Sequence, residues 1–259
     1  MGNQRQDLIR KQFSQNTTDY RDEAVFSEGE DLQHMVASIT FTGKERVLDI
    51  GSGAGHTALT FAPFVAECIG CDLTPEMVNV ATQLARDKDI RNVHFRLGDV
   101  ENLEFGNASF DFVTCRYAAH HFSNLQQAIQ EVTRVLKPGG TFVLVDPYVP
   151  EDDDLDSFVN EIEHMRDSSH VRDYRLSEYK SCFQNAGLSY HEEFKWDVLL
   201  QFDNWIQRAR TPVDMTKKLV ARLQTASSLV KETFRIHLDD TGSPISFCLN
   251  CSLLHGVKI

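Results

Sequence analysis

The chain has 259 residues, of which 41% are hydrophobic and 25% charged, values typical of a globular protein and not of a disordered or membrane-embedded one. Its 38 acidic and 26 basic residues give a formal net charge of −12, which disfavours nucleic acid as a partner because the sequence has no basic patch to offset it. It contains no apolar run of about 20 residues and no apolar signal segment at its start, so we expect a cytoplasmic protein without a membrane span.

Residues 1–45 are expected to form a helical cap over the edge of a sheet, since their apolar residues recur at helical spacing. From residue 46 onward, strand-like and helix-like segments alternate. The expected strands are 46–50, 66–71, 93–97, 110–115 and 141–145, and the expected helices are 54–64, 75–86 and 125–136. This alternation predicts a parallel sheet covered on both faces, with ligands beyond the carboxyl ends of its strands.

The regular alternation ends near residue 150. An acidic loop at 151–154, expected to be solvated, precedes a helix at 155–166, a polar stretch at 167–174, a helix at 177–186, a strand at 188–198, helices within 202–238 and a last strand at 246–257. The helices between the last two strands are expected to cover the substrate. We therefore expect one domain in three segments: the cap 1–45, a cofactor-binding core 46–150, and residues 151–259 with the remaining strands and a lid.

Two Cys-x-x-Cys pairs, Cys68/Cys71 and Cys248/Cys251, have a spacing that is also found in zinc sites. Both pairs fall in expected strands, where residues three apart point to opposite faces of the sheet. Neither pair could then converge on one metal ion. We expect structural thiols and no metal site.

Three glycines, Gly51, Gly53 and Gly55, directly follow the first expected strand. Without Cβ atoms, the backbone there can turn tightly and approach a ligand at the N-terminus of the next helix. A nicotinamide site would prefer Gly-x-Gly-x-x-Gly, which requires glycine where the chain has His56. Glycine-rich turns also occur in loops that bind nothing, so this run alone does not identify the ligand.

Acidic residues narrow the choice of ligand. Asp49, Asp72 and Asp99 each fall at the end of an expected strand. Any one of them could simply cap a helix, but all three in register with the glycines favour a ligand site. A pyrophosphate beside Asp49 would be repelled. A cationic ligand without phosphate, such as S-adenosylmethionine, fits better.

The chain resembles the class I S-adenosylmethionine-dependent methyltransferases, especially the small-molecule branch that includes ubiquinone and menaquinone C-methyltransferases. The resemblance covers roughly residues 40 to 150 and rests on five motifs in order: Val47–Gly55, Gly70–Met77, Gly98–Val100, Phe110–Arg116 and Leu136–Gly140. It implies an α/β fold with a Rossmann-like, doubly wound, seven-stranded and mostly parallel sheet, an antiparallel last strand and a partial helical lid. It also implies methyl transfer from S-adenosylmethionine to O, N or C of a small molecule.

The resemblance assigns several residues to the methionine end of the cofactor. Asp49 would support this end directly or through water, while Gly51 and Gly53 would let the backbone approach it. The carbonyl of Cys115 or Arg116 would hold the ammonium group, although Arg116 could also merely pack. Two aromatic residues before the first strand would close over the carboxylate: Phe13 and Tyr20.

Five further residues would hold the adenosine end. Asp72 would accept hydrogen bonds from both ribose hydroxyls. Leu73 and Met77 would flank the adenine, although Met77 could equally belong to a helix core. Asp99 would accept from the adenine amine, and the backbone N–H of Val100 would donate to a ring nitrogen.

The acceptor side is less well defined by the sequence. His120 and His121 follow the fourth expected strand, where either could act as a general base or could serve to orient other groups. The polar stretch 167–174 could face the pocket, with Arg172 or Arg166 binding an acceptor carboxylate or phosphate, or it could be a solvated loop.

Two other functions remain open at this point. One is an S-adenosylmethionine-binding protein without turnover, acting as a sensor or partner subunit on the same fold. The other, less favoured, is a nicotinamide oxidoreductase. The sequence indicates neither the acceptor nor the oligomeric state.

Overall fold

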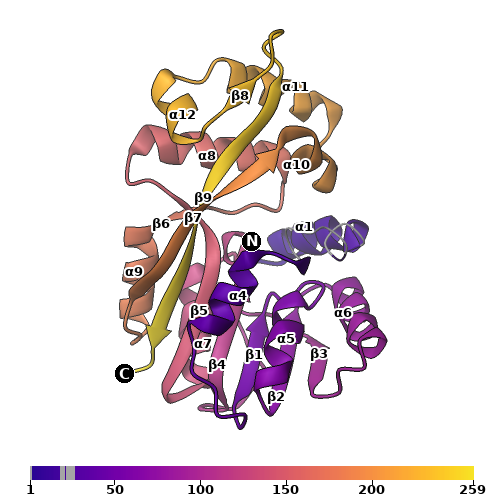
Figure 1. Cartoon of the computed structure of the whole chain (residues 1–259), viewed down its shortest axis with the longest axis vertical. Coiled ribbons are helices and arrows are strands. Elements are labelled where there is room, and N and C mark those ends of the chain that lie inside the picture. The colour runs from indigo at the N-terminus through magenta and orange to yellow at the C-terminus, as the bar shows by residue number, and fades with distance from the viewer. Residues whose placement is uncertain (1, 18–20, 22–26) are drawn as a thin grey trace.

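The computed structural model of the chain describes residues 2–17, 21 and 27–259. A twisted central sheet dominates the fold (Figure 1). Its main path has the strand order β3 (Val93–Leu97), β2 (Glu67–Asp72), β1 (Arg46–Ile50), β4 (Phe110–Arg116), β5 (Leu136–Val149), β9 (Pro244–Val257) and β7 (His191–Gln201). β9 runs antiparallel to both of its neighbours, and the remaining neighbouring strands pair in parallel. The expected seven-stranded, mostly parallel sheet with a reversed last strand is therefore confirmed; two-residue strands, β6 (Tyr174–Arg175) and β8 (His237–Leu238), add to it.

Helices cover both faces of the sheet, as the alternation predicts. One face packs against α4 (Glu30–Ala37), α5 (His56–Phe61) and α6 (Pro75–Asp87), and the other against α7 (Leu125–Val135) and α9 (Leu176–Asn185). Val47 and Leu48 of β1 illustrate the alternation, since Val47 is buried in the first of these cores and Leu48 in the second. The carboxyl ends of the parallel strands are left free to form a site.

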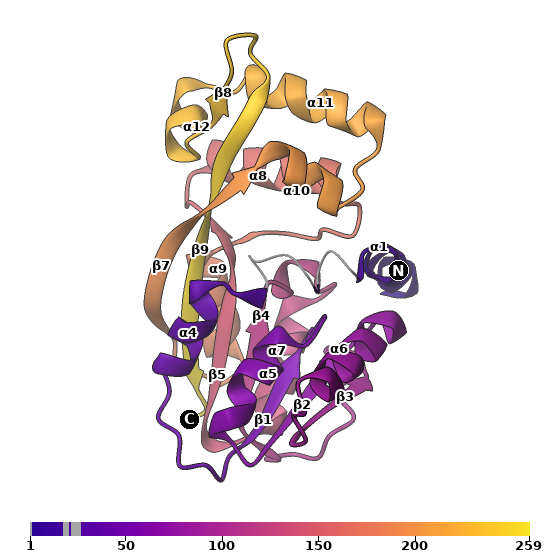
Figure 2. The same ribbon diagram turned by 45° about the vertical axis from the view of Figure 1, so that its right-hand side comes forward.

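A smaller helical layer lies over the carboxyl ends of the strands (Figure 2). It consists of α8 (Asp153–Arg166), α10 (Phe202–Arg208), α11 (Val213–Gln224) and α12 (Ser228–Thr233), which pack on the extended ends of β7 and β9 around their own apolar core. The sequence pattern predicts lid helices between the last two strands only. α8 joins it because its apolar face, with Phe158 and Ile162, packs with Leu219 and Leu223 of α11.

The acidic run at 151–154 is exposed to solvent, as expected, but it is not only a loop, because its last two residues begin α8. Asp152 caps α8, because its Oδ1 accepts hydrogen bonds from the N–H groups of Asp154 and Leu155 at 3.0 and 3.1 Å. The helix begins at Asp153. Acidic residues are stabilising at this position because they face the positive end of the helix dipole.

The cysteines behave as structural thiols in the described residues. All six are free, and Cys68 and Cys71 of β2 belong to the cores on opposite faces of the sheet. Burial raises the pKa of the Cys71 thiol to about 12. Within the described ranges, no group of three or more His, Cys, Asp or Glu side chains is placed to hold a metal ion.

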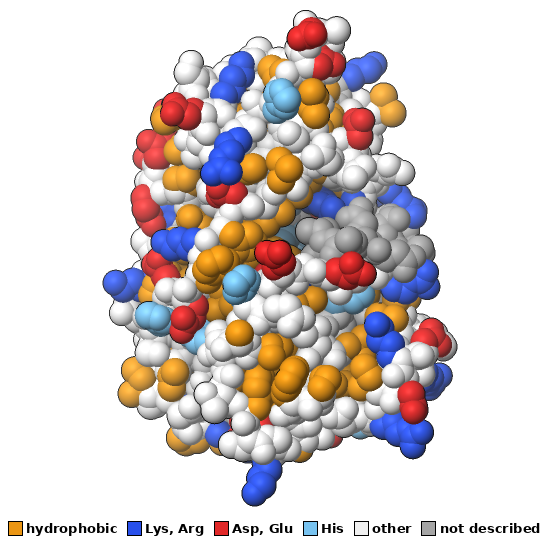
Figure 3. All heavy atoms as spheres, in the orientation of Figure 1, with side chains coloured by type: hydrophobic (Ala, Val, Ile, Leu, Met, Phe, Trp, Pro, Cys, Tyr) orange, Lys and Arg blue, Asp and Glu red, His pale blue; other side chains and the backbone are white. Residues whose placement is uncertain are grey.

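Two broader surface properties follow. On the part of the described surface drawn in Figure 3, basic and acidic side chains are interspersed and form no continuous basic patch. None of the helices in the described residues combines the length and apolar character that crossing a membrane requires.

Candidate functional site

A first cavity of about 130 Å³ lies at the carboxyl ends of β1, β2 and β4, with α1 (Gly2–Gln15) along its side. It brings together most of the residues that were predicted to bind a cofactor: Gly51, Gly53, Asp72, Leu73, Met77, Asp99, Val100 and Arg116. Asp49 and Cys115 are buried behind these residues and do not line the cavity. Tyr20 lies outside the described residues.

The turn after β1 requires glycine for a measurable reason. Gly51 has φ +60°, and a Cβ on it would lie 2.6 Å from Cβ of Ala118. Gly55 has φ +88°, and a Cβ there would lie 2.5 Å from the ring of Phe95. Side chains at these positions would be both strained and obstructed, so the glycines allow the turn to pass closely between β1 and α5.

Asp72, at the end of β2, connects two walls of the first cavity. Its carboxylate accepts hydrogen bonds from the N–H of Gly53 and from the N–H of Thr74, each at 2.8 Å. Burial raises the pKa of this carboxyl group. The two backbone contacts orient the carboxylate and leave oxygen lone pairs available for ligand hydroxyl groups.

Asp99 is held in a similar way from two directions. Oδ1 accepts from the N–H of Glu101 at 2.9 Å, and Oδ2 accepts from Nε2 of Gln6 at 2.7 Å. Gln6 and Ile9 of α1 line the same cavity, although the sequence pattern predicts neither of them as a site residue. A helix that lies 93 residues away in the sequence thus contributes one wall.

The same helix also reaches the lid. Nε of Arg10 donates to the carbonyl of Leu73 at 3.3 Å, and Nε2 of Gln12 donates to the carbonyl of Ala209, after α10, at 3.0 Å. α1 therefore bridges the first cavity and the helical layer (Figure 2).

Asp49 lies beneath the glycine turn. Its Oδ1 accepts from Oγ1 of Thr114 at 2.7 Å. The N–H of Ala58 also favours the carboxylate, although no described donor makes a hydrogen bond of ordinary geometry to the buried Oδ2. Burial raises the pKa of Asp49 to about 7. Oγ of Ser52, in the turn itself, is likewise buried without a described partner. Unsatisfied polar atoms at this place fit a site completed by a polar ligand or by water.

Arg116 and Tyr117 form the edge of the cavity after β4. The Arg116 guanidinium makes a buried ion pair with Asp31 of α4, with Nη2 and Oδ1 3.0 Å apart, and its Cζ lies 4.8 Å from the centroid of the Tyr117 ring. Tyr117 has φ +51°, an unusual conformation for a residue other than glycine that is often found at functional sites. The Arg116 side chain thus has a structural partner, and the residue also lines the first cavity.

A second cavity of about 90 Å³ lies between the end of β4 and the lid. It shares Phe13, Tyr117 and His121 with the first cavity, so the two are neighbours. Its other lining residues combine charged groups with an apolar wall: His120, Pro147, Glu163, Arg166, Asp173, Val198, Leu200, Trp205, Arg208, Leu249 and Cys251.

His120 is held by a buried carboxylate. Its N–H donates to Oδ2 of Asp146 and its Nδ1 lies near Oδ1, both at 2.9 Å, while the hydroxyl of Tyr179 donates to Oδ2 at 3.0 Å. Burial alone would lower the pKa of His120, but the negative charge and hydrogen bond of Asp146 raise it to about 9. His120 is therefore protonated at neutral pH.

His121 has the opposite character. Burial and the adjacent positive charge of His120 lower its pKa to about 3, so its imidazole is neutral. Nδ1 lies 3.2 Å from the carbonyl oxygen of Ser169, to which it donates in the neutral ring, and this leaves Nε2 unprotonated. The ring packs edge-on against Phe13, with the centroids 5.0 Å apart.

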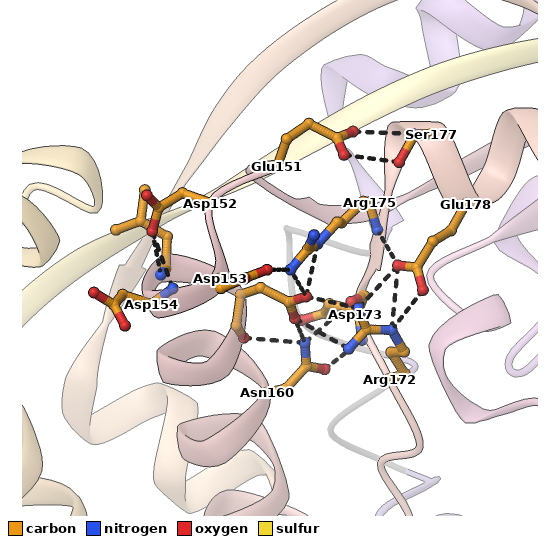
Figure 4. Close-up of polar contacts among 12 residues, drawn as sticks. Glu151, Asp152, Asp153, Asp154, Asn160, Arg172, Asp173, Arg175, Ser177 and Glu178 are labelled. Carbon is orange, nitrogen blue, oxygen red and sulfur yellow. Dashed lines mark hydrogen bonds and ion pairs between the residues drawn. The ribbon is translucent and has the colours of Figure 1, made fainter.

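The polar stretch 167–174 is not a solvated loop, because Asp167, Ser169, His170 and Asp173 are buried. Arg172 does not line either of the two cavities. Its guanidinium pairs with Asp156 at 2.7 Å and with Glu178 at 2.9 Å. Figure 4 shows the contact with Glu178. The suggestion that Arg172 binds an acceptor is therefore wrong, since two carboxylates already neutralise it outside the cavity.

Arg166, the alternative to Arg172, does line the second cavity. It too has protein partners, because its Nε donates to the carbonyl of Trp205 at 2.9 Å and its Nη1 lies 3.2 Å from Glu163.

The doubly wound sheet, the glycine turn after β1 and the acids at the ends of β2 and β3 define a Rossmann-like methyltransferase. The chain belongs to the family described as "Methyltransferase domain" (Methyltransf_31), whose model matches residues 41–210. It is a methyltransferase that uses S-adenosylmethionine, which decides against the nicotinamide oxidoreductase.

Similar proteins agree with this assignment. The uncharacterized methyltransferase YcgJ of Bacillus subtilis is 51% identical over 95% of this chain and 97% of its own length. A crystal structure of YcgJ superimposes with a TM-score of 0.87 at 49% identity, covering 88% of this chain and 98% of that one. A demethylmenaquinone methyltransferase of Deinococcus radiodurans is 39% identical, but over only 39% of this chain and 42% of its own length.

Proposed function

We propose that this enzyme methylates an O, N or C atom of a small molecule that binds in the second cavity. The observation that carries the proposal is the junction of the two cavities at Phe13, Tyr117 and His121. A molecule in the second cavity would meet the first cavity only at this junction. The small size of the second cavity, about 90 Å³, and its cover by the lid favour a metabolite over a macromolecule.

The residues of the first cavity suit S-adenosylmethionine. Asp72 would hold the ribose diol, Asp99 and the N–H of Val100 would hold the adenine, and Leu73 and Met77 would flank it. These acids suit a ligand with positive groups and no phosphate.

The methionine end would lie at the glycine turn. Asp49 would support it from below, directly or through water, and Gly51 and Gly53 would leave room for it. The carbonyl of Arg116, which lines the cavity, or of Cys115, which lies behind it, would accept from the ammonium group.

When bound, the cofactor supplies a methyl group on a positively charged sulfur. The protein's own contribution is positioning and proton handling. Holding the acceptor in line at the junction replaces a two-body encounter by an internal step, which is worth up to roughly 7–11 kcal/mol. The lid and α1 would exclude water, which favours a step in which the positive charge leaves the sulfur.

His121 is the residue best placed to accept a proton from the acceptor. Its neutral ring has Nε2 unprotonated, because Nδ1 donates to Ser169. An acceptor that attacks the methyl group through a hydroxyl or an amino group must lose a proton around the time of attack. His120, fixed in its charged form by Asp146, would orient this region without taking that proton.

A transfer assay tests the proposal. The enzyme is incubated with S-adenosylmethionine tritiated on its methyl group and a small-molecule extract of cells, and labelled products are separated and identified by mass spectrometry. We expect a labelled small molecule that is absent with Asp72→Ala. Tight binding of S-adenosylmethionine without transfer to any compound would contradict the proposal and favour a sensor or partner subunit.

A further inference from the structure

Asp173 is an unusual residue in the wall of the second cavity. The residue is only 1% exposed, and neither oxygen of its carboxyl group has a hydrogen-bond partner among the described residues. Buried carboxyl groups in folded proteins are normally paired or hydrogen-bonded. Asp173 lines the second cavity, so a molecule bound there could supply the missing partner.

The backbone of Asp173 is fixed even though its carboxyl group is not. Its N–H donates to Oδ1 of Asn160 at 2.8 Å, and its carbonyl accepts from Nδ2 of the same residue at 3.1 Å. Asn160 lies on α8 and is itself held by Asp156 at 2.7 Å (Figure 4). The preceding Arg172 points to Asp156 and Glu178, so it does not neutralise Asp173. The backbone of Asp173 is therefore held in place by α8, while its carboxyl group keeps both oxygens available.

The surroundings of Asp173 restrict what could bind there. Burial raises the pKa of its carboxyl group to about 8, against the opposing effects of His120 and Arg166. Glu163 and Asp146 add negative charge nearby and raise it further. At neutral pH the carboxyl group is therefore largely protonated, and it becomes a pure hydrogen-bond acceptor as the pH rises above 8. The wall beside it is apolar.

That apolar wall is formed by buried side chains of the lid and of the two long strands. Trp205 of α10, Leu200 of β7 and Leu249 of β9 are 1%, 9% and 6% exposed and line the same cavity. Such a wall suits an aromatic or aliphatic body.

We propose that Asp173 recognises the methyl acceptor by accepting a hydrogen bond from its hydroxyl or amino group, while the apolar body of the acceptor packs against Trp205, Leu200 and Leu249. This assignment rests on the proposed function, and it narrows the acceptor to a small, largely apolar molecule with a hydrogen-bond donor. A site built for such a donor discriminates strongly against analogues that lack it, because the buried acceptor is then left unpaired.

Binding of matched probes tests the assignment without knowledge of the natural acceptor. Benzyl alcohol, benzylamine, benzyl methyl ether and toluene are titrated by ligand-observed NMR into the full chain saturated with S-adenosylhomocysteine, at pH 9, where the Asp173 carboxyl group is ionised and can only accept. We expect the alcohol or the amine to bind at least tenfold more tightly than the ether and toluene. The alcohol and amine arms distinguish the two donor types.

Variants show whether Asp173 causes the preference. We expect Asp173→Ala and Asp173→Leu, which both lack an acceptor, to reduce it to less than threefold, and Asp203→Asn, which changes an exposed acid on the lid helix α10, to keep it. An unchanged preference in the Asp173 variants would overturn the assignment, as would failure of both donor probes to bind at 10 mM. Asp173→Leu also keeps the proposal testable if Asp173→Ala fails to fold.

The same variants separate this assignment from the proposed function. Labelled product from the wild type, together with a KM for the acceptor that is the same in Asp173→Leu as in the wild type, would overturn the role of Asp173 but leave the proposed function intact. If the wild type gives no labelled product but its preference for donor probes depends on Asp173, the proposed methyl transfer is contradicted. The role of Asp173 in recognising a donor group is then kept.

Discussion

Gln6 of α1 donates a hydrogen bond from Nε2 to Oδ2 of Asp99 across 2.7 Å, and this contact joins the N-terminal helix to the predicted adenine side of the first cavity. Oδ1 of Asp99 is meanwhile held by the N–H of Glu101. The helix thus contributes to the cavity through a residue that orients an acid.

The first prediction concerns this contact. Gln6→Glu places a second carboxylate against Asp99, and we expect S-adenosylhomocysteine to bind about tenfold more weakly, a loss of about 1.4 kcal/mol, because the two charges push α1 away. Isothermal titration calorimetry measures this change in the affinity for S-adenosylhomocysteine. Gln83→Glu is a matched control, since Gln83 makes the same kind of contact, 2.7 Å to Asp87, on an exposed face outside the cavity. Equal affinities for wild type and Gln6→Glu would show that α1 does not support the site.

The second prediction concerns Asp72. We expect Asp72→Ala to weaken S-adenosylhomocysteine binding at least 100-fold, because it removes the predicted ribose contact and also frees the N–H groups of Gly53 and Thr74. Asp72→Asn keeps the shape and one oxygen, so its loss should be smaller. Calorimetry gives both affinities, and circular dichroism shows whether the variants are folded. An affinity for Asp72→Ala within threefold of wild type would refute the role of Asp72.

Much of the first cavity could be predicted because its residues follow strands closely in the chain. Gly51, Asp72 and Asp99 all lie at or just beyond strand ends, and parallel strands bring such ends to one edge of the sheet. Gln6 could not be found in this way, since its role depends on where α1 packs.

The second cavity was harder to predict for the same reason. Its wall combines Asp173, Trp205 and Leu249 from three separate segments, and α8 joins the lid only through tertiary packing. For the polar stretch 167–174 the sequence leaves open whether it faces the pocket or is a solvated loop, because its composition is typical of a solvated loop. Burial of Asp173 depends on Asn160, a contact between residues 13 positions apart with no periodic signal.

The third prediction is a pH dependence of cofactor binding that arises from Asp49. Its pKa of about 7 is above the usual value for Asp, so the folded protein holds a proton that the unfolded chain releases near pH 4. The stability contribution of this group therefore falls as the pH rises from about 4 through 7. A positively charged ligand nearby favours the carboxylate, so binding releases the proton and becomes tighter as the pH rises through 7.

Titration at pH 6, 7 and 8 in buffers of different ionisation enthalpy measures this proton release. At pH 7 we expect about half a proton to be released from Asp49, and less at pH 8. Asp49→Asn, which cannot ionise, provides the baseline that accounts for the ligand's own groups. Identical proton release in the variant and the wild type would mean that Asp49 does not sense the ligand.

The fourth prediction separates the two histidines. With an acceptor that must lose a proton, we expect His121→Ala to lower kcat by roughly 10²–10⁴ with little change in KM. Since the pKa of His121 is about 3, the wild-type rate should show no loss of activity from this group between pH 8 and pH 5. An ordinary histidine base would lose activity below about pH 6.5.

His120→Asn is the comparison for this experiment. It removes a charged ring that is bound to Asp146, so we expect a change in stability and a pKa of His121 closer to its usual value. The acidic limb of the rate profile should then move to higher pH. Full activity of His121→Ala would rule out a proton-transfer role for His121.

The fifth prediction concerns the buried ion pair of Arg116 and Asp31, whose side chains are 4% and 5% exposed. Asp31→Ala leaves the Arg116 guanidinium buried without this carboxylate, and we expect a loss of about 3–5 kcal/mol in the free energy of unfolding. Replacing both partners by apolar residues, Asp31→Leu with Arg116→Met, should recover most of that loss, because neither desolvated charge remains. Urea denaturation measures both values. Since Arg116 also lines the first cavity, Asp31→Ala should weaken S-adenosylhomocysteine binding as well. Equal stabilities of Asp31→Ala and the wild type would show that the ion pair does not anchor α4 to β4.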